Sequence, residues 1–271
     1  MAKVDCTFTP DWWHTNTGVE FTQRFFLDPD YRVEADRAMR ACLYKMFGAL
    51  GLGEADPKPR PLLDTDLLAG EYLQAQLLGC EVRFTENQAP EVLALNLDDT
   101  QAMALAPPDL SAHPLWRQYE AQLQALSCRY GYAESYLDMC GVQNLALSLR
   151  GEALMMDYYS DPDIANHVLD VATRCILAVA ERIGRYTPNL AQGVSAIIKQ
   201  TAPSLYLTSN CTVEMVSANT YEEFLLPFDL RLAQAHPPFG VHHCGQSCQR
   251  LAESYRKIPG LALLEVGAGS D

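Results

Sequence analysis

The stretch Val241-His242-His243-Cys244-Gly245 closes a short apolar run and decides how the second half of the chain is interpreted. Around it, apolar extended segments alternate with longer segments of helical character. The pattern predicts strands at Ser204–Thr208, Phe239–His243 and Leu261–Val266, and helices at Tyr221–His236 and Gln246–Lys257. Alternation of this kind is typical of βαβ units that build a parallel sheet.

The first half of the chain carries matching signals. Asp28-Pro29-Asp30 and Asp161-Pro162-Asp163 each place an N-cap aspartate before a proline, so a helix is expected to begin at both. The pattern also predicts a strand and a helix within 62–79, a helix at His113–Tyr130, and strands at Cys80–Phe84, Val92–Leu97 and Val142–Leu149. No glycine-rich phosphate turn follows an early strand, which favours a TIM-type (β/α)8 barrel over a doubly wound sheet. We expect one α/β domain over residues 1–271, with residues 1–61 as a helical N-terminal extension.

Composition excludes several classes of function. The formal charge of the 271 residues is −14, and no basic stripe is present, so neither nucleic acid nor an anionic membrane is expected as a partner. No apolar run is long enough to span a bilayer. Nine unevenly spaced cysteines do not form the dense paired pattern of a secreted disulfide framework. With no signal peptide evident, we expect a cytoplasmic protein.

His242 and Cys244 are the strongest candidates for chemistry. Side chains alternate along a strand, so these two point to one side and His243 to the other. A nitrogen and a sulfur at this spacing are natural zinc ligands, and Glu265, at the end of the next strand, could add an oxygen ligand. An ordinary buried pair is the alternative, because buried free cysteine is common. A local site that includes Cys248 is a further alternative.

Two other polar groups follow predicted strands. Ser209-Asn210-Cys211-Thr212 could orient a substrate, together with Tyr206, or could cap the following segment. Asp66, in the sequence Leu62-Leu63-Asp64-Thr65-Asp66, could serve as a general acid or base, although an N-cap role for the following helix is the better explanation.

Together these segments resemble the uroporphyrinogen decarboxylase superfamily, which includes cobalamin-dependent methyltransferases that act on coenzyme M. The resemblance is carried by the strand that ends in His242-His243-Cys244-Gly245, by the helix Tyr221-Glu222-Glu223-Phe224-Leu225-Leu226-Pro227, and by the helix start at Asp161. It implies a (β/α)8-type barrel with its cleft at the carboxyl ends of the strands. In the methyltransferase branch it further implies zinc on His242 and Cys244, a later cysteine as an additional ligand, and Glu265 at the open position.

The chain departs from the family in two places. The decarboxylases carry an arginine-rich motif near the N-terminus, whereas Asp11–Phe25 contains one arginine, Arg24. Several carboxylates of a tetrapyrrole need several cations, which counts against decarboxylation. The family also continues through about two more βα units. We therefore expect a barrel that is incomplete at its C-terminus, with open strand edges that favour a homodimer.

Three functions follow from these expectations. The leading one is a zinc-dependent methyltransferase that moves a methyl group between a corrinoid, such as cobalamin, and a small thiol-type acceptor. A corrinoid protein is its candidate partner. The second is a decarboxylase of the uroporphyrinogen type that uses Asp66. The third is a non-catalytic protein that binds a corrinoid or tetrapyrrole.

Overall fold

A computed structural model describes residues 6–63, 72–135, 137, 139–187, 198, 201–202, 204–267 and 269–270. Within these residues the fold is mixed α/β. The strands described form one three-stranded sheet and two two-stranded sheets. Among the helices of this part of the chain, none combines the length and the apolar composition needed to cross a bilayer.

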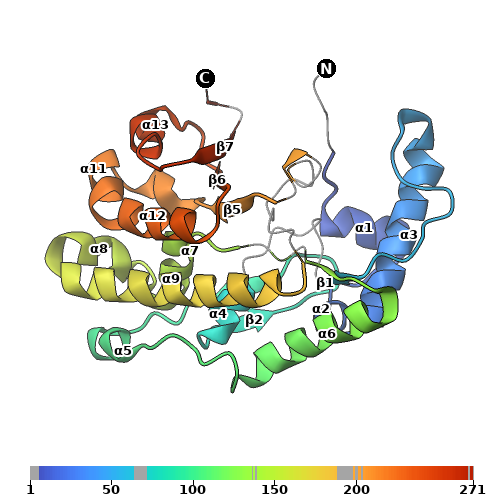
Figure 1. Cartoon of the computed structure of the whole chain (residues 1–271), viewed down its shortest axis with the longest axis horizontal. Helices are drawn as coiled ribbons and strands as arrows, with labels where there is room; N and C mark the ends of the chain where they lie inside the picture. The colour runs from blue at the N-terminus through green and yellow to red at the C-terminus, as the bar shows by residue number, and fades with distance from the viewer. Residues whose placement is uncertain are drawn as a thin grey trace.

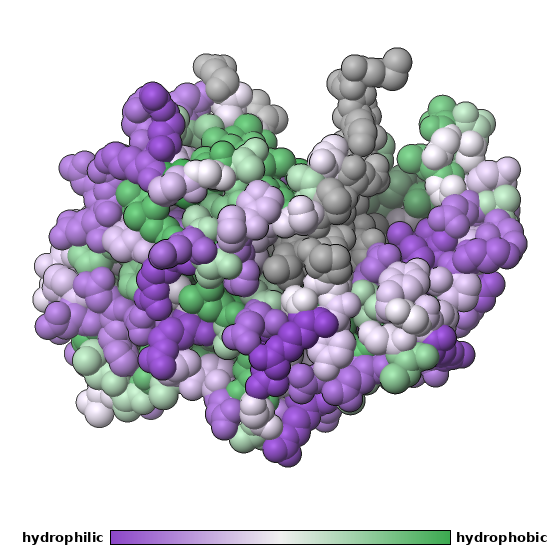
Figure 2. All heavy atoms as spheres, in the orientation of Figure 1, coloured by the Kyte–Doolittle hydropathy of each residue, from purple (hydrophilic) through white to green (hydrophobic). Residues whose placement is uncertain are grey.

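The three-stranded sheet holds the strands predicted for the second half of the chain. Its order is β5 (Tyr206–Ser209), β6 (Phe239–His243) and β7 (Leu261–Val266), and both pairs are parallel. Every residue of β5 and β6 is buried, whereas β7 is only partly covered. Hydrophobic side chains accordingly gather on the visible surface over β7 (Figure 2). The predicted parallel sheet is confirmed here.

Helices surround this sheet on two sides (Figure 1). A continuous helical segment of α11 (Ala218–Thr220), a π-helical turn (Tyr221–Leu225) and α12 (Leu226–Ala235) joins β5 to β6, and α13 (Gln249–Tyr255) joins β6 to β7. Below them lie α7 (Val142–Arg150), α8 (Ala153–Ser160) and α9 (Pro162–Gly184). The long α9 buries one apolar face, from Ile164 to Ile183, in the main core.

The two Asp-Pro helix starts are confirmed. The carboxylate of Asp28 accepts hydrogen bonds from the backbone N–H groups of Asp30 and Tyr31 at 3.1 Å and begins α3 (Pro29–Phe47). Asp161 accepts one from Ile164 at 3.4 Å and begins α9. Each aspartate satisfies amides that the first helical turn leaves without an intrahelical partner.

The predicted strand at Val142–Leu149 is wrong. These residues form α7, whose N-cap is Gly141. The apolar run that suggested a strand is the buried face of a helix, with Val142, Leu145 and Leu149 among its buried residues. A short apolar run is compatible with either structure, and here packing against α9 decides in favour of the helix.

The first half of the chain differs in other ways from a simple βαβ repeat. The strands β2 (Glu81–Arg83) and β3 (Glu91–Leu93) pair antiparallel, whereas β1 (Leu62–Leu63) and β4 (Glu134–Ser135) pair in parallel. The predicted helix at His113–Tyr130 is confirmed as α6 (Pro114–Tyr130). The helices α1 (Pro10–Thr17) and α2 (Gln23–Leu27) lie in the segment expected to be a helical extension, and α4 (Leu73–Leu77) lies in the predicted helical stretch. The pattern missed the short helices α5 (Asp99–Ala104) and α8.

Candidate metal centre

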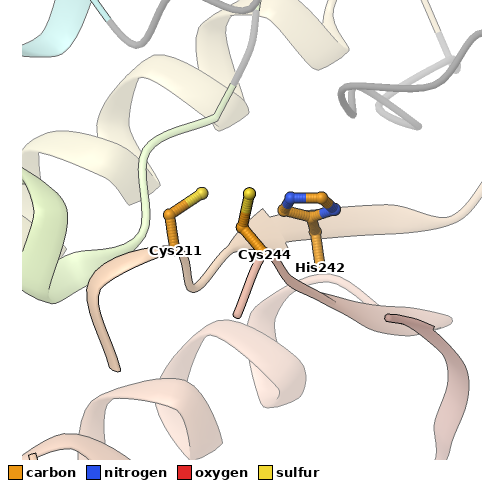
Figure 3. Close-up of side chains that lie close together, drawn as sticks. All are labelled: Cys211, His242 and Cys244. Carbon is orange, nitrogen blue, oxygen red and sulfur yellow. The ribbon is translucent and has the colours of Figure 1, made fainter. Parts of the chain in front are cut away.

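Three side chains that can bind a metal converge at the carboxyl end of the three-stranded sheet. One ligand atom from each of Cys211, His242 and Cys244 lies within 4.8 Å of the other two. The side chains point toward a common space (Figure 3). We call these three residues the cluster.

The register of the sheet explains why the cluster forms. Ser209 of β5 pairs with His242 of β6. Cys211 lies two residues after Ser209, and Cys244 lies two residues after His242, so the two cysteines leave their strands side by side. Cys244 is exposed, Cys211 is partly exposed, and His242 is buried. The cluster therefore has one side fixed in the core and one side open to solvent.

A turn held by α7 carries Cys211. The side-chain amide of Asn144 donates to the carbonyl oxygen of Ser209 at 2.8 Å, and its oxygen accepts from the backbone N–H of Thr212 at 3.0 Å. Gly141 packs so closely that a Cβ there would lie 2.0 Å from the oxygen of Ser209. The helix α7, predicted as a strand, thus holds the residues on both sides of Cys211.

Glu265 orients the imidazole of His242. Nδ1 of His242 donates a hydrogen bond to Oε2 of Glu265 at 2.6 Å, and the two residues are paired across β6 and β7. Because Nδ1 is engaged, Nε2 is the nitrogen left for a metal. Nε2 is buried and has no oxygen or nitrogen partner within the described part of the chain.

The electrostatics of His242 reflect this setting. Burial lowers the pKa of His242. The thiol groups of Cys211 and Cys244 and the carboxylate of Glu265 raise it by more, so that the pKa is about 11. The metal-free site thus keeps a proton on His242 at neutral pH. A cation that takes the place of this proton would meet a buried nitrogen and two sulfur atoms, while the carboxylate of Glu265 stays hydrogen-bonded to the other ring nitrogen.

His243 points to the opposite side of β6, as its alternation with His242 predicts. Its side chain is fully buried, and its Nδ1 lies 2.9 Å from the hydroxyl of Tyr255, with which it forms a hydrogen bond. Burial lowers the pKa of His243. His243 is therefore a core residue and takes no part in the cluster.

Asn210 and Tyr206, also predicted for the site, contribute no ligand atom to the cluster. The amide of Asn210 donates to the buried carboxylate of Asp229 at 2.7 Å. Tyr206 begins β5, at the far end of the strand from the cluster, and stacks on His236 with ring centroids 4.8 Å apart. Asp66 lies outside the described residues.

Cys248 is the alternative ligand that the sequence left open. It is buried just before α13, and its backbone N–H donates to the hydroxyl of Ser270 at 3.1 Å. Within the described residues, the group of potential ligands includes Cys211 in its place. The signal that could have identified Cys211 is its position just past a strand that neighbours the His242 strand.

A depression opens beside Cys244. It has a volume of about 570 Å³, and its lining consists of Cys244, Gly245, Gln246, Ser247, Gly267 and Gly269. Two of the glycines are required by close backbone approach: a Cβ at Gly267 would lie 2.3 Å from the oxygen of Gly245, and one at Gly269 would lie 2.0 Å from the oxygen of Gln246. The two loops therefore meet without side chains between them.

Comparison with known proteins places the fold. The chain superposes on the structure of a methyltransferase from Methanosarcina mazei with a TM-score of 0.53 and 14% sequence identity, over 95% of this chain and 75% of that one. At this identity the likeness shows a shared mixed α/β fold. No protein-family model matches the sequence, and no curated protein matches it.

Proposed function

We propose that the protein is a zinc-dependent methyltransferase built on a barrel of the uroporphyrinogen decarboxylase type. The observation that carries the proposal is the convergence of Cys211, Nε2 of His242 and Cys244 at the carboxyl end of a parallel sheet. The fold of an archaeal methyltransferase supports it. In the proposal, a methyl group moves between a corrinoid and a small thiol-type acceptor.

The donor set fits zinc. Two cysteine sulfurs and one imidazole nitrogen are ligands that Zn²⁺ prefers, and three protein ligands leave one position of a tetrahedron open. Bound zinc would hold an acceptor thiol in its deprotonated, nucleophilic form. Nε2 of His242 is buried without an oxygen or nitrogen partner among the described residues, and bound zinc would satisfy it.

Each residue of the chain then has a separate task. Cys211, His242 and Cys244 bind the ion, and Glu265 keeps the imidazole in the tautomer that offers Nε2. If Glu265 were instead to fill the open position, it would have to leave Nδ1 of His242. We therefore assign Glu265 the orienting task.

The depression beside Cys244 is the proposed acceptor site. It reaches the exposed side of the cluster, and its described lining consists of three glycines together with Cys244, Gln246 and Ser247. Such a surface admits a small molecule to Cys244 while His242 stays buried. The corrinoid would approach from the solvent side, carried by a partner protein or free.

Metal content tests the proposal directly. We expect about one zinc per purified chain by inductively coupled plasma mass spectrometry, as a three-ligand site requires. The Cys244→Ala variant should lose it, whereas Cys128→Ala, at an exposed cysteine on α6, should retain it. The zinc-loaded chain should then demethylate methylcobalamin in the presence of a thiol, which visible absorbance follows.

Two outcomes would overturn the proposal. A wild-type chain that binds no zinc after reconstitution would remove the metal from the reaction. Zinc-loaded protein that never demethylates methylcobalamin, but decarboxylates a tetrapyrrole equally well with and without zinc, would favour the decarboxylase instead.

A further inference from the structure

Asp229 is a buried carboxyl group that the proposed chemistry does not use. Its side chain on α12 is 1% exposed. Its Oδ2 accepts a hydrogen bond from the hydroxyl of Tyr221 at 2.6 Å and another from the amide of Asn210 at 2.7 Å. Burial raises the pKa of Asp229 to about 6, although both hydrogen bonds lower it. A carboxyl group held in the core at this cost calls for a reason.

Asn210 connects Asp229 to the cluster. It lies between Ser209 and Cys211, and its backbone N–H donates to the carbonyl oxygen of His242 at 2.8 Å. The side chain of Asn210 is thus bound to α12, while its backbone is bound to β6. Any shift of Asn210 would change the distance between Cys211 and His242.

The π-helical turn brings the other partner to Asp229. Tyr221 begins this turn, and Asp229 lies eight positions later in the same continuous helical segment. In a regular α-helix, residues eight apart would be offset by about 80° around the axis. The π turn has more residues per turn and so reduces this offset, which brings the side chains of Tyr221 and Asp229 to the same face of the helix. Single π turns of this kind are frequent at functional sites.

We propose that Asp229 is a positioning residue for the cluster: through Tyr221 and Asn210 it sets the spacing between Cys211 and His242. The role rests on the proposed metal function. It also gives a task to Tyr221, the first residue of the segment Tyr221–Pro227, because its hydroxyl is the donor to Asp229.

Cobalt(II) titration of the full chain tests the role, because the ion reports both its affinity and, through thiolate-to-cobalt absorption, its ligands. Asp229→Asn should weaken Co²⁺ binding about tenfold or more, as loss of an outer hydrogen-bond partner does at other metal sites. Tyr221→Phe keeps the ring and removes one donor, so we expect a smaller loss of about fivefold.

Asp36→Asn is the matched control. Asp36 is also buried, 3% exposed, and pairs with Arg40 at 2.7 Å, but it lies on α3, away from the cluster in Figure 1. This variant should lower the melting temperature and leave Co²⁺ affinity and absorption unchanged.

Three results would overturn the role. Wild-type Co²⁺ affinity and absorption in both Asp229→Asn and Tyr221→Phe would show that Asp229 only fills the core. An equal loss of affinity in Asp36→Asn would show that general destabilisation is the cause. If the wild-type chain itself did not bind Co²⁺, the metal site would be rejected, and the role of Asp229 with it. Wild-type binding together with unchanged binding by the variants would reject the role of Asp229 alone.

Discussion

Nδ1 of His242 and Oε2 of Glu265 are joined by a hydrogen bond of 2.6 Å between the ends of two neighbouring parallel strands. The bond fixes the ring of His242 so that its second nitrogen faces the sulfur atoms of Cys211 and Cys244 (Figure 3). One carboxylate thereby determines which nitrogen is available to a metal.

Glu265→Gln should weaken zinc binding by about tenfold to a hundredfold, because the amide is a poorer partner for Nδ1 than a carboxylate. Competition with a chromophoric chelator measures the dissociation constant. Glu253→Gln is the control, since Glu253 is exposed and contacts only Arg256 among the ion pairs described. An unchanged dissociation constant in Glu265→Gln would contradict the orienting role.

Cys211→Ser and Cys248→Ser separate the two possible third ligands. We expect Cys211→Ser to lose zinc, because serine oxygen replaces a thiolate that the geometry directs at the cluster. Cys248→Ser should keep zinc and lose at most some stability, since its buried sulfur packs before α13. Metal content and the melting temperature of both variants give the answer. The reverse pattern would assign the site to Cys244 and Cys248.

Zinc affinity should rise with pH. Below a pKa of about 11, His242 of the metal-free chain holds a proton that zinc must displace. That one proton makes the apparent affinity fall about tenfold for each unit by which the pH decreases. Cysteine thiols also release protons and add to the slope of log affinity against pH. The decisive comparison is therefore with the His242→Asp variant. Its carboxylate is already deprotonated, so its slope should be smaller by about one. Equal slopes in the two proteins would contradict the proton on His242.

The same pKa has the opposite effect on the metal-free chain. Its folded value, about 11, lies above the ordinary value of 6.5, so His242 contributes stability that is fully present below about pH 6.5. This contribution is lost as the pH rises through the folded pKa. Urea titrations of chelated wild-type and His242→Asn protein should therefore differ most at the acidic end of the range.

Ser247→Trp should block the depression without removing the metal. Ser247 lines the depression and binds no ion in the proposal, so a large side chain there would occupy the space for an acceptor. We expect zinc content to stay at the wild-type level while the KM for the thiol rises about tenfold or more. Arg256→Trp, at an exposed position, controls for an added tryptophan. Wild-type KM in Ser247→Trp would place the acceptor elsewhere.

The sequence was most informative where local signals agree. Asp28 and Asp161 begin helices as their Asp-Pro motifs predict, and alternation along β6 correctly separates His242 from His243. These features depend on neighbouring residues in the chain, so a single sequence can reveal them. The parallel order of β5, β6 and β7 followed from the same kind of signal.

Tertiary packing decided the rest. Nothing local shows that Val142–Leu149 is a helix, because its apolar residues suit a buried strand as well. The partnership of Cys211 with His242 depends on the register between two strands about thirty residues apart in sequence, which periodicity alone does not give. The bond of Asn210 to Asp229 likewise spans a helix and a strand end, and no sequence pattern predicted it.

The paired strands β5, β6 and β7 follow one another in sequence between Tyr206 and Val266. The paired strands β1 and β4 are separated by a longer stretch of chain, from Leu63 to Glu134. Shorter loops are closed at lower entropic cost and earlier in folding. The three-stranded sheet can thus form before β1 and β4 meet. If the cluster binds zinc as proposed, an ion bound at that stage would stabilise the three-stranded sheet before the rest of the fold forms.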